Sequence, residues 1–345
     1  MAMIIPGGTT EPAIPIELTD LGPSAGKSGR SRSPALRALA RMGKAIRSNR
    51  KASWGAGLLI LFILIGVFAG VIAPGYPNQT GQFRTGLGLS WHHLLGTNGL
   101  GEDLFSQVIW GARPVLEIAF GVGLASTAIA VLIGVAAAYL GGLWDAVLSL
   151  GTDILLVIPL FPLLIVIATY LNGAGTGVMI AVLTLTGWSF TARQLRSQAL
   201  SLRKRDFLEA ARVRGERPIY IIVVEIIPTM TSLLVASFLT NALYAVLFSS
   251  SLQFIGLGDP NQVSWGTMLK AAENNEAFQT GQSLWIIAPG LCIVALGAAF
   301  ALLNYAFDEV GNPALRPLRR QTLKQAPRRQ KPARALRRTS AQQIG

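Results

Sequence analysis

The stretch that decides the fold is "EAARVRGERPIYIIVVEIIP", residues 209–228, which lies between long apolar segments. Its first half carries five charged side chains within nine residues, from Glu209 to Arg217. Gly215 suits the left-handed conformation that ends many helices, and Pro218 suits the first turn of a new helix. The stretch therefore predicts a helix, a sharp turn and a second helix, which interrupt an otherwise apolar chain.

The composition of the whole chain indicates a membrane protein. Of its 345 residues, 51% are hydrophobic and only 14% are charged, which exceeds the apolar share of an ordinary soluble domain. A helix needs about 20 mainly apolar residues to cross a bilayer, and the alternating pattern of a membrane barrel is absent. We therefore expect an all-α, polytopic membrane protein with six transmembrane helices. These spans are expected at roughly 54–73, 115–140, 146–171, 177–192, 219–248 and 284–306.

The positive charges predict the orientation of those helices. Lys and Arg total 30, and 27 of them lie in the three segments 27–51, 193–217 and 316–338. Alternating helices place these segments on one side, and the positive-inside rule assigns that side to the cytoplasm. Both termini are then cytoplasmic, and the net charge of +13 reflects orientation and contact with anionic lipid. We do not expect nucleic-acid binding, because the basic runs lack interleaved aromatic residues.

Four regions follow from these patterns. Residues 1–32, rich in Gly, Pro and Ser, are expected to form a disordered cytoplasmic tail. Residues 33–51 are expected to form a basic amphipathic helix on the inner leaflet, with a plain solvated helix as the alternative. Residues 52–310 are expected to form the transmembrane domain, and residues 311–345 a basic cytoplasmic tail.

The sequence offers no constellation for catalysis or for metal binding. His92 and His93 are adjacent, point apart and have no third ligand at metal-ligand spacing, so we expect solvent-exposed side chains. Cys292 is the only cysteine, so no internal disulfide is expected. Acidic residues lie toward the ends of the expected spans, whereas ion-driven carriers keep them near the midplane. We therefore expect no catalytic, metal or cofactor site in this chain, and we expect the energy for any transport to enter from elsewhere. A channel or secondary carrier subunit remains one open class.

Short motifs along the chain resemble one transporter family. Glu209-Ala210-Ala211, then Gly215, then Ile226-Ile227-Pro228 follow the spacing of the EAA loop of ABC importer permeases, which in that family docks into a cleft of the cytoplasmic ATPase. Four more segments resemble, in the same order, signatures of the C-type permease subunit of dipeptide, oligopeptide and nickel importers. They are "LLGTNGLGEDLFSQVIWGARPVL" (94–116), "YLGGLWDAVLSLGTDILLVIPLFPLL" (139–164), "SLQFIGLGDPNQVSWGTML" (251–269) and "FDEVGNPALR" (307–316).

The resemblance implies roles for particular residues. In the EAA loop, taken as 194–228, the implied docking residues are Glu209, Ala210, Ala211, Arg212, Gly215 and Pro218, and the helix restarts at Ile226, Ile227 and Pro228. The outer family motif comprises Gly96, Thr97, Gly101, Asp103, Gly111 and Arg113, and the other motif residues are Asp153, Pro159, Gly256, Gly258, Trp265 and Gly266. The chain departs from the family at Glu102, Gln107 and Leu150 (customarily Arg), Ser249 (commonly Glu) and Thr229 (often Asn).

The function that the resemblance implies is that of a permease subunit with the type I ABC importer fold in a bacterial inner membrane. The implied partners are a second, B-type permease, two cytoplasmic ATPase subunits that bind ATP and Mg²⁺, and an extracytoplasmic substrate-binding protein. The implied mechanism is alternating access, driven by ATPases docked at the EAA loop. Peptides are the expected substrate, with nickel chelates, glutathione or other small solutes as alternatives.

Overall fold

The structure is a computed structural model that describes residues 50–73, 77–171 and 175–311. These residues belong to the larger of two compact units, Arg41–Gly345. They are mostly helical, and the single β-type contact among them is a bridge between Thr97 and Asp103. The two expected tails, apart from residue 311, and nearly all of the expected basic helix lie outside the described residues.

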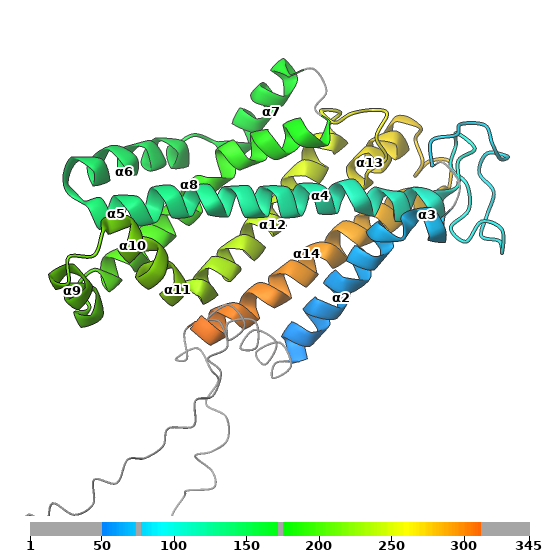
Figure 1. The fold of residues 1–345 in the computed structure, drawn as a ribbon. Coiled ribbons are helices and arrows are strands. Elements are labelled where there is room, and N and C mark those ends of the chain that lie inside the picture. The colour runs from blue at the N-terminus through cyan, green and yellow to red at the C-terminus, as the bar shows by residue number, and fades with distance from the viewer. Residues whose placement is uncertain (1–49, 74–76, 172–174, 312–345) are drawn as a thin grey trace, which may run out of the picture. The chain divides into compact units, whose positions relative to one another are not determined.

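The described residues form a series of helices joined by short connections, with one longer loop before α4 (Figure 1). The segments η1 and η2 are π-helical. In order along the chain, the elements are α2 (Arg50–Val67), α3 (Ala69–Ile72), α4 (Leu104–Ala130), η1 (Val131–Val135), α5 (Ala136–Leu140), α6 (Gly142–Val157), α7 (Leu160–Tyr170), α8 (Thr176–Leu202), α9 (Asp206–Val213), α10 (Pro218–Tyr220), η2 (Ile221–Ile226), α11 (Ile227–Thr229), α12 (Thr231–Phe254), α13 (Trp265–Asn274) and α14 (Leu284–Gly311).

Four helical segments in the described part of the chain are long and apolar enough to cross a membrane. They are Arg50–Val67, Leu104–Leu140, Thr231–Phe254 and Leu284–Phe307. The pair α6 and α7 makes a fifth if it is counted as one broken span, because its two helices are bent by 89°. The chain is therefore a helical, multi-pass membrane protein.

Four of the expected spans differ from the structure. The one over 54–73 is interrupted at Phe68, and the one over 177–192 lies in α8, which is not among these apolar segments. A continuous helix over 219–248 is wrong, because α10, η2 and α11 form a separate short segment and α12 begins only at Thr231. The expected span 146–171 is broken at Ile158 and Pro159, which separate α6 from α7. Proline fixes its own backbone and disfavours a helical conformation in the preceding residue, which accounts for the break.

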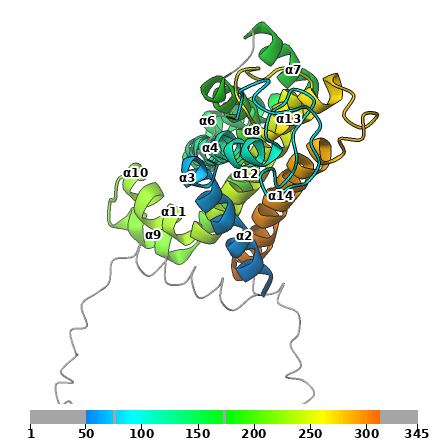
Figure 2. The same cartoon turned by 90° about the vertical axis from the view of Figure 1, so that its right-hand side faces the viewer.

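Four groups of buried apolar side chains hold the described helices together, and the smallest of them joins α3 to α4. The first joins α2, α4, α12, α13 and α14. The second joins the end of α4, η1, α5, α8, α9 and η2, and the third joins α4, α7, α8 and α12. Figure 1 accordingly shows α9 at one end of α4 and the long loop at the other. Figure 2 shows α2 and α14 on one side and α9, α10 and α11 on the other.

Buried polar side chains connect three of these helices. Asn241 of α12 donates to the hydroxyl of Thr127 on α4 at 3.0 Å and accepts from the hydroxyl of Thr191 on α8 at 3.0 Å. Hydrogen bonds between helices satisfy polar groups that lipid cannot solvate. The three helices are therefore held by directional bonds as well as by apolar packing.

Trp265 anchors α13 against α4 and supplies the first prediction. It is fully buried, and its indole N–H donates to the carbonyl of Val108 at 3.0 Å. A Cβ at Gly111 would lie 2.9 Å from this ring, so Gly111→Leu should destabilise the fold by about 1–3 kcal/mol through overpacking. Thermal unfolding in detergent should show a lower Tm. The matched control is Gly151→Leu on α6, where a Cβ meets nothing within 4 Å; an equal fall in Tm for both variants would contradict this packing account.

Candidate functional site

The charged segment folds into an amphipathic helix, α9, directly after α8. Asp206 and Glu209 lie in its first turn and Arg212 in its last, which suits the positive and negative ends of the helix dipole. Leu208 and Ala211 are fully buried in the second group of apolar side chains. The opposite face is exposed to solvent, and it carries Glu209, Ala210, Arg212 and Val213.

The turn after α9 has the geometry that the sequence predicts. Gly215 has φ +77° and donates its N–H to the carbonyl of Arg212 at 2.9 Å, while Glu216 donates to the carbonyl of Ala211 at 3.2 Å. These two bonds form a Schellman motif, in which a left-handed glycine ends the helix. Pro218 then occupies the first position of α10. The predicted helix, sharp turn and second helix are confirmed.

The segment after the turn is a π-helix that returns the chain to the interior. Ile221 and Ile226 begin and end η2, and both are buried in the same apolar group as α9. They lie five residues apart, the spacing of one hydrogen-bonded π-helical turn, so both face inward. Of the two other residues at the helix restart, Ile227 is partly buried and Pro228 is exposed, and both belong to α11.

One expectation about α9 needs correction. As docking residues implied by the resemblance, Ala210 and Ala211 were both expected to lie on an exposed face, but Ala211 is 0% exposed. Residues three apart share a face of a helix, so Ala211 lies beside Leu208 on the buried side. Only Ala210 supplies the small exposed surface.

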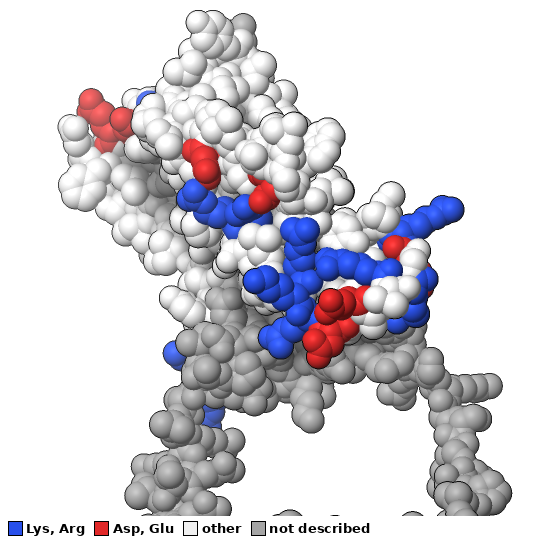
Figure 3. All heavy atoms as spheres, turned by 90° about the vertical axis from the view of Figure 1, so that its left-hand side faces the viewer, with Lys and Arg blue, Asp and Glu red and all other residues white. Residues whose placement is uncertain are grey.

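A basic hollow borders α9. This open surface hollow has a volume of about 710 Å³ and is lined by Leu200, Ser201, Arg203, Lys204, Glu209 and Arg212. The Arg212 guanidinium lies 5.5 Å from the centre of the Tyr139 ring, and Arg203 donates to the carbonyl of Ala138 at 3.4 Å. Figure 3 shows Lys and Arg side chains gathered at this end, with several carboxylates among them. The two arginines thus hold the segment around α9 against α5.

The expected outer motif lies at the other end of α4 and is compact around one loop. Gly96 and Gly101 have positive φ, and the Thr97 hydroxyl donates to the carbonyl of Arg84 at 2.7 Å. Asp103 caps α4 by accepting from the N–H of Ser106 at 2.8 Å. These four motif residues therefore shape the loop and start the helix.

The remaining motif residues fall into three separate places. Arg113 lies exposed on α4 and pairs with Glu117 at 3.2 Å. Asp153 on α6 pairs with Arg193 of α8, and Pro159 lies at the bend before α7. Gly256 and Gly258 lie between α12 and α13, and Trp265 and Gly266 begin α13. A Cβ at Gly258 or Gly266 would come within 2.7 Å of the Gln253 side chain. The structure thus does not bring these residues together with the EAA segment.

Glu102 and Gln107, two of the positions that depart from the family pattern, form a hydrogen bond with each other. The Gln107 amide donates to Glu102 Oε2 at 2.7 Å, and the Asn98 amide donates to the same oxygen at 2.7 Å. Thr80 donates to Glu102 Oε1 at 3.2 Å. Glu102 is buried, so it organises the loop before α4. Sequence alone identified both positions as unusual but gave no sign that they are in contact.

Removing this buried carboxylate should loosen the loop. Glu102→Ala leaves the Asn98 amide without its acceptor, whereas the Gln107 amide keeps its bond to the carbonyl of Pro77 at 3.1 Å. A buried group that is left unsatisfied costs about 1–3 kcal/mol. We expect a lower Tm in detergent and faster hydrogen exchange in the loop. Glu117→Ala is the control, because its ion pair is exposed and such pairs contribute about 0–1 kcal/mol. Equal Tm values for the two variants would contradict the organising role of Glu102.

Two further contacts were not foreseen. His93 was expected to be solvent-exposed like His92, but its Nδ1 lies 3.0 Å from Asp103 Oδ1 and its ring packs edge-on against Phe83. Asp145 of α6 and Arg196 of α8 form a two-bond ion pair, although neither was singled out. The sequence did contain a signal for the Asp145–Arg196 pair. Arg196 follows an apolar run, and an arginine in or near a membrane needs a partner.

The family comparison covers just over half of the chain. A family model described as "Binding-protein-dependent transport system inner membrane component" matches residues 130–310, which include α8, α9 and the whole EAA segment. The chain belongs to this family. It is a permease subunit of an ABC importer, as the EAA loop had indicated.

Several relatives of this permease bear names that refer to peptides. A putative peptide permease protein of Brucella suis is 30% identical over 287 residues, which cover 82% of this permease and 94% of the relative. The oligopeptide transport system permease protein OppC of Mycobacterium tuberculosis is 34% identical over 231 residues, covering 66% and 78%. A putative peptide transport system permease protein of Brucella suis is 32% identical over 276 residues, covering 78% and 90%.

Proposed function

We propose that this permease forms the translocation path of a peptide importer together with a second permease subunit, and that α9 docks onto a cytoplasmic ATPase subunit. The observation that carries the docking role is the exposed face of α9, whose orientation is set by a rigid glycine turn and by the buried Leu208 and Ala211. The names of the relatives support peptides as the substrate. An extracytoplasmic binding protein delivers them, and ATP and Mg²⁺ bind to two partner ATPases.

The proposed mechanism is alternating access. When the ATPase dimer closes on ATP, it moves α9. Because α8 precedes α9 in the chain and η2 follows it, the movement reaches α8 directly and reaches α12 through η2. The bundle then opens outward to accept substrate and relaxes inward after hydrolysis. This chain itself contributes no bond chemistry and no cofactor; its contribution is a shaped path and a mechanical link.

The substrate assignment is tested by uptake into vesicles. The complete transporter, with its second permease, ATPases and binding protein, is reconstituted and supplied with labelled di- and oligopeptides, a nickel chelate and glutathione in turn. We expect ATP-dependent uptake of peptide. Uptake of the chelate or of glutathione alone would assign the permease to one of those substrates instead.

The proposed topology has six spans, with both termini in the cytoplasm of a bacterium. Counting α8 as a span adds the sixth to the four long segments and the bent pair. α8 is less apolar because it carries Arg193 and Arg196, and its Thr191 bonds to Asn241 inside the bundle. The loop before α4 is then outside, and α9 is inside.

Labelling of single cysteines tests this topology. In a Cys292→Ala background, Thr85→Cys in the loop before α4 should react with an impermeant thiol reagent in intact cells, whereas Lys204→Cys beside α9 should react only after permeabilisation. Both positions are exposed in the structure. Labelling of Lys204→Cys alone in intact cells would reverse the orientation.

A further inference from the structure

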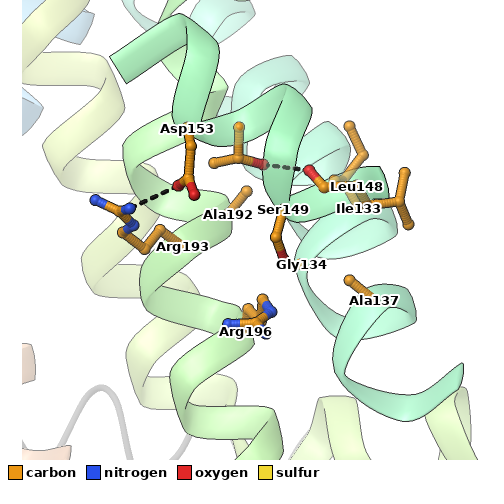
Figure 4. A pocket seen from close by; sticks show the side chains of 10 residues that line it. Ile133, Gly134, Ala137, Leu148, Ser149, Asp153, Ala192, Arg193 and Arg196 are labelled. Atoms are coloured by element: carbon orange, nitrogen blue, oxygen red, sulfur yellow. Dashed lines mark hydrogen bonds and ion pairs between the residues drawn. The ribbon is translucent and has the colours of Figure 1, made fainter. Parts of the chain in front are cut away.

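Two ion pairs join α6 to α8 beside a small cavity. Arg196 donates through Nε and Nη2 to the two carboxylate oxygens of Asp145 at 2.6 and 2.7 Å, and Arg193 donates to Asp153 at 2.6 Å. The cavity has a volume of about 80 Å³. Figure 4 shows Asp153 of α6 reaching toward Arg193, with Arg196 further along α8. Two oppositely charged pairs thus connect the same two helices.

The two pairs differ in strength. Asp145 and Arg196 are 21% and 33% exposed, whereas Asp153 and Arg193 are 50% and 60% exposed. A two-bond arginine–carboxylate pair fixes the relative orientation of its partners, and partial burial reduces screening by water. A single-contact, exposed pair contributes little. The Asp145–Arg196 pair is therefore the one that holds α6 and α8 in a fixed relative orientation.

The neighbouring contacts make α8 a poor candidate for independent movement. A Cβ at Gly134 would clash with the carbonyl oxygen of Ala192, so η1 and α8 touch backbone to backbone. Beyond α8, Arg203 and Arg212 contact the last residues of α5. The elements η1, α5, α8 and α9 also share the second group of buried side chains. α6 is attached to this assembly by the turn after α5, by the two ion pairs and by Leu155, which packs against the second group of buried side chains.

Because α6 is followed directly by α7, the attachment of α6 to α8 also affects α7. α6 leads through the 89° bend into α7, and α7 packs in the third group of buried side chains with α4, α8 and α12. A movement of α9 that is transmitted to α6 therefore reaches α7 as well. Apart from the ion pairs and the packing of Leu155, α6 is linked to this assembly by a turn that contains Gly141 and Gly142, both at positive φ. Glycine gives the backbone more freedom there.

We propose that Asp145 and Arg196 are positioning residues of the transport cycle, whose ion pair makes α6 and α7 follow the ATPase-docking segment. The inference rests on the proposed function of α9. It predicts that breaking the pair uncouples ATP hydrolysis from uptake, while a folded permease still binds its ATPases. A residue with only a structural role would lower the amount of complex and would leave the uptake per ATP unchanged.

The first experiment measures transport coupling. In the reconstituted complex, Asp145→Asn and Arg196→Gln should each lower the uptake per ATP hydrolysed by about tenfold, within the usual range of coupling between sites. The charge swap Asp145→Arg with Arg196→Asp should restore most of it. Asp153→Asn is the comparison, because it removes the exposed pair between the same helices, and it should have a smaller effect. Wild-type coupling in both single variants would overturn the proposal.

The second experiment measures distances between spin labels and separates this proposal from the one on which it rests. Exposed label sites are available at Gln198 on α8, Val157 on α6 and Val294 on α14. On ATP binding, the distance from Gln198 to Val294 should change by about 1–2 Å or more, while the distance from Gln198 to Val157 stays constant in the wild type and varies in Asp145→Asn. If the distance from Gln198 to Val294 does not change, the proposed coupling through α8 and α9 fails.

A change in the wild-type distance from Gln198 to Val157 as large as that to Val294 would instead contradict the ion-pair proposal alone. This wild-type measurement decides the matter even if Asp145→Asn does not reach the membrane.

Discussion

Replacing Gly215 with Val is expected to abolish substrate uptake while the permease still inserts and still pairs with its partner permease. Gly215 has φ +77°, a conformation that costs a β-branched residue about 1–2 kcal/mol or more. No atom lies within 4 Å of a Cβ at this position, so the cost comes from the backbone alone. The turn should relax, and the exposed face of α9 should tilt away from its docking orientation.

The matched control is Gly215→Asn. Asn adopts the left-handed conformation far more readily than Val does, so this variant should retain its ATPases and most of its uptake. Pull-down of the ATPases, binding-protein-stimulated ATP hydrolysis and uptake are measured for both. If Gly215→Val and Gly215→Asn both kept the activity of the wild type, the turn geometry would have no part in coupling.

The second large effect is expected at Ala210. Ala210 is exposed on α9, so Ala210→Trp places a bulky ring on the proposed docking surface without disturbing the interior. We expect normal membrane abundance and normal Tm, with weak retention of the ATPases and loss of uptake. Retention of the ATPases with wild-type uptake would show that this face is not the docking surface.

Ala211→Trp serves as the contrast to this variant. Ala211 is fully buried beside Leu208, so a large ring there overpacks the interior, which typically costs about 1–3 kcal/mol and occasionally more. Its loss of function should therefore come with a lower Tm or reduced abundance. Two variants one residue apart thus separate a surface effect from a folding effect.

The local structure of the EAA segment was predictable because its determinants are local. A glycine suited to positive φ and a proline suited to the start of a helix lie three residues apart, and both act through their own backbone. Gly215 and Pro218 accordingly occupy the expected positions. The expected exposure of Ala211 was wrong, because the sequence does not fix which face of α9 meets the apolar residues of η2.

The spans were predicted less well, since hydropathy does not distinguish lipid contact from protein contact. The isoleucines and valines of η2 resemble a membrane span, but Ile221 and Ile226 pack against α9 within the chain. The 89° bend at α6 and α7 is likewise invisible to an average over apolar residues. Contacts between distant segments, such as Glu102 with Gln107 and Asp145 with Arg196, require the fold itself.

The most direct measurement of the central claim is site-specific photo-cross-linking from α9. A photoreactive amino acid replaces Ala210 in the assembled transporter, and a second variant carries it at Thr85, an exposed position in the loop before α4. Irradiation should join Ala210 to an ATPase subunit, and Thr85 should give no such product. Failure of Ala210 to capture the ATPase in a complex that still transports substrate would contradict the docking role of α9.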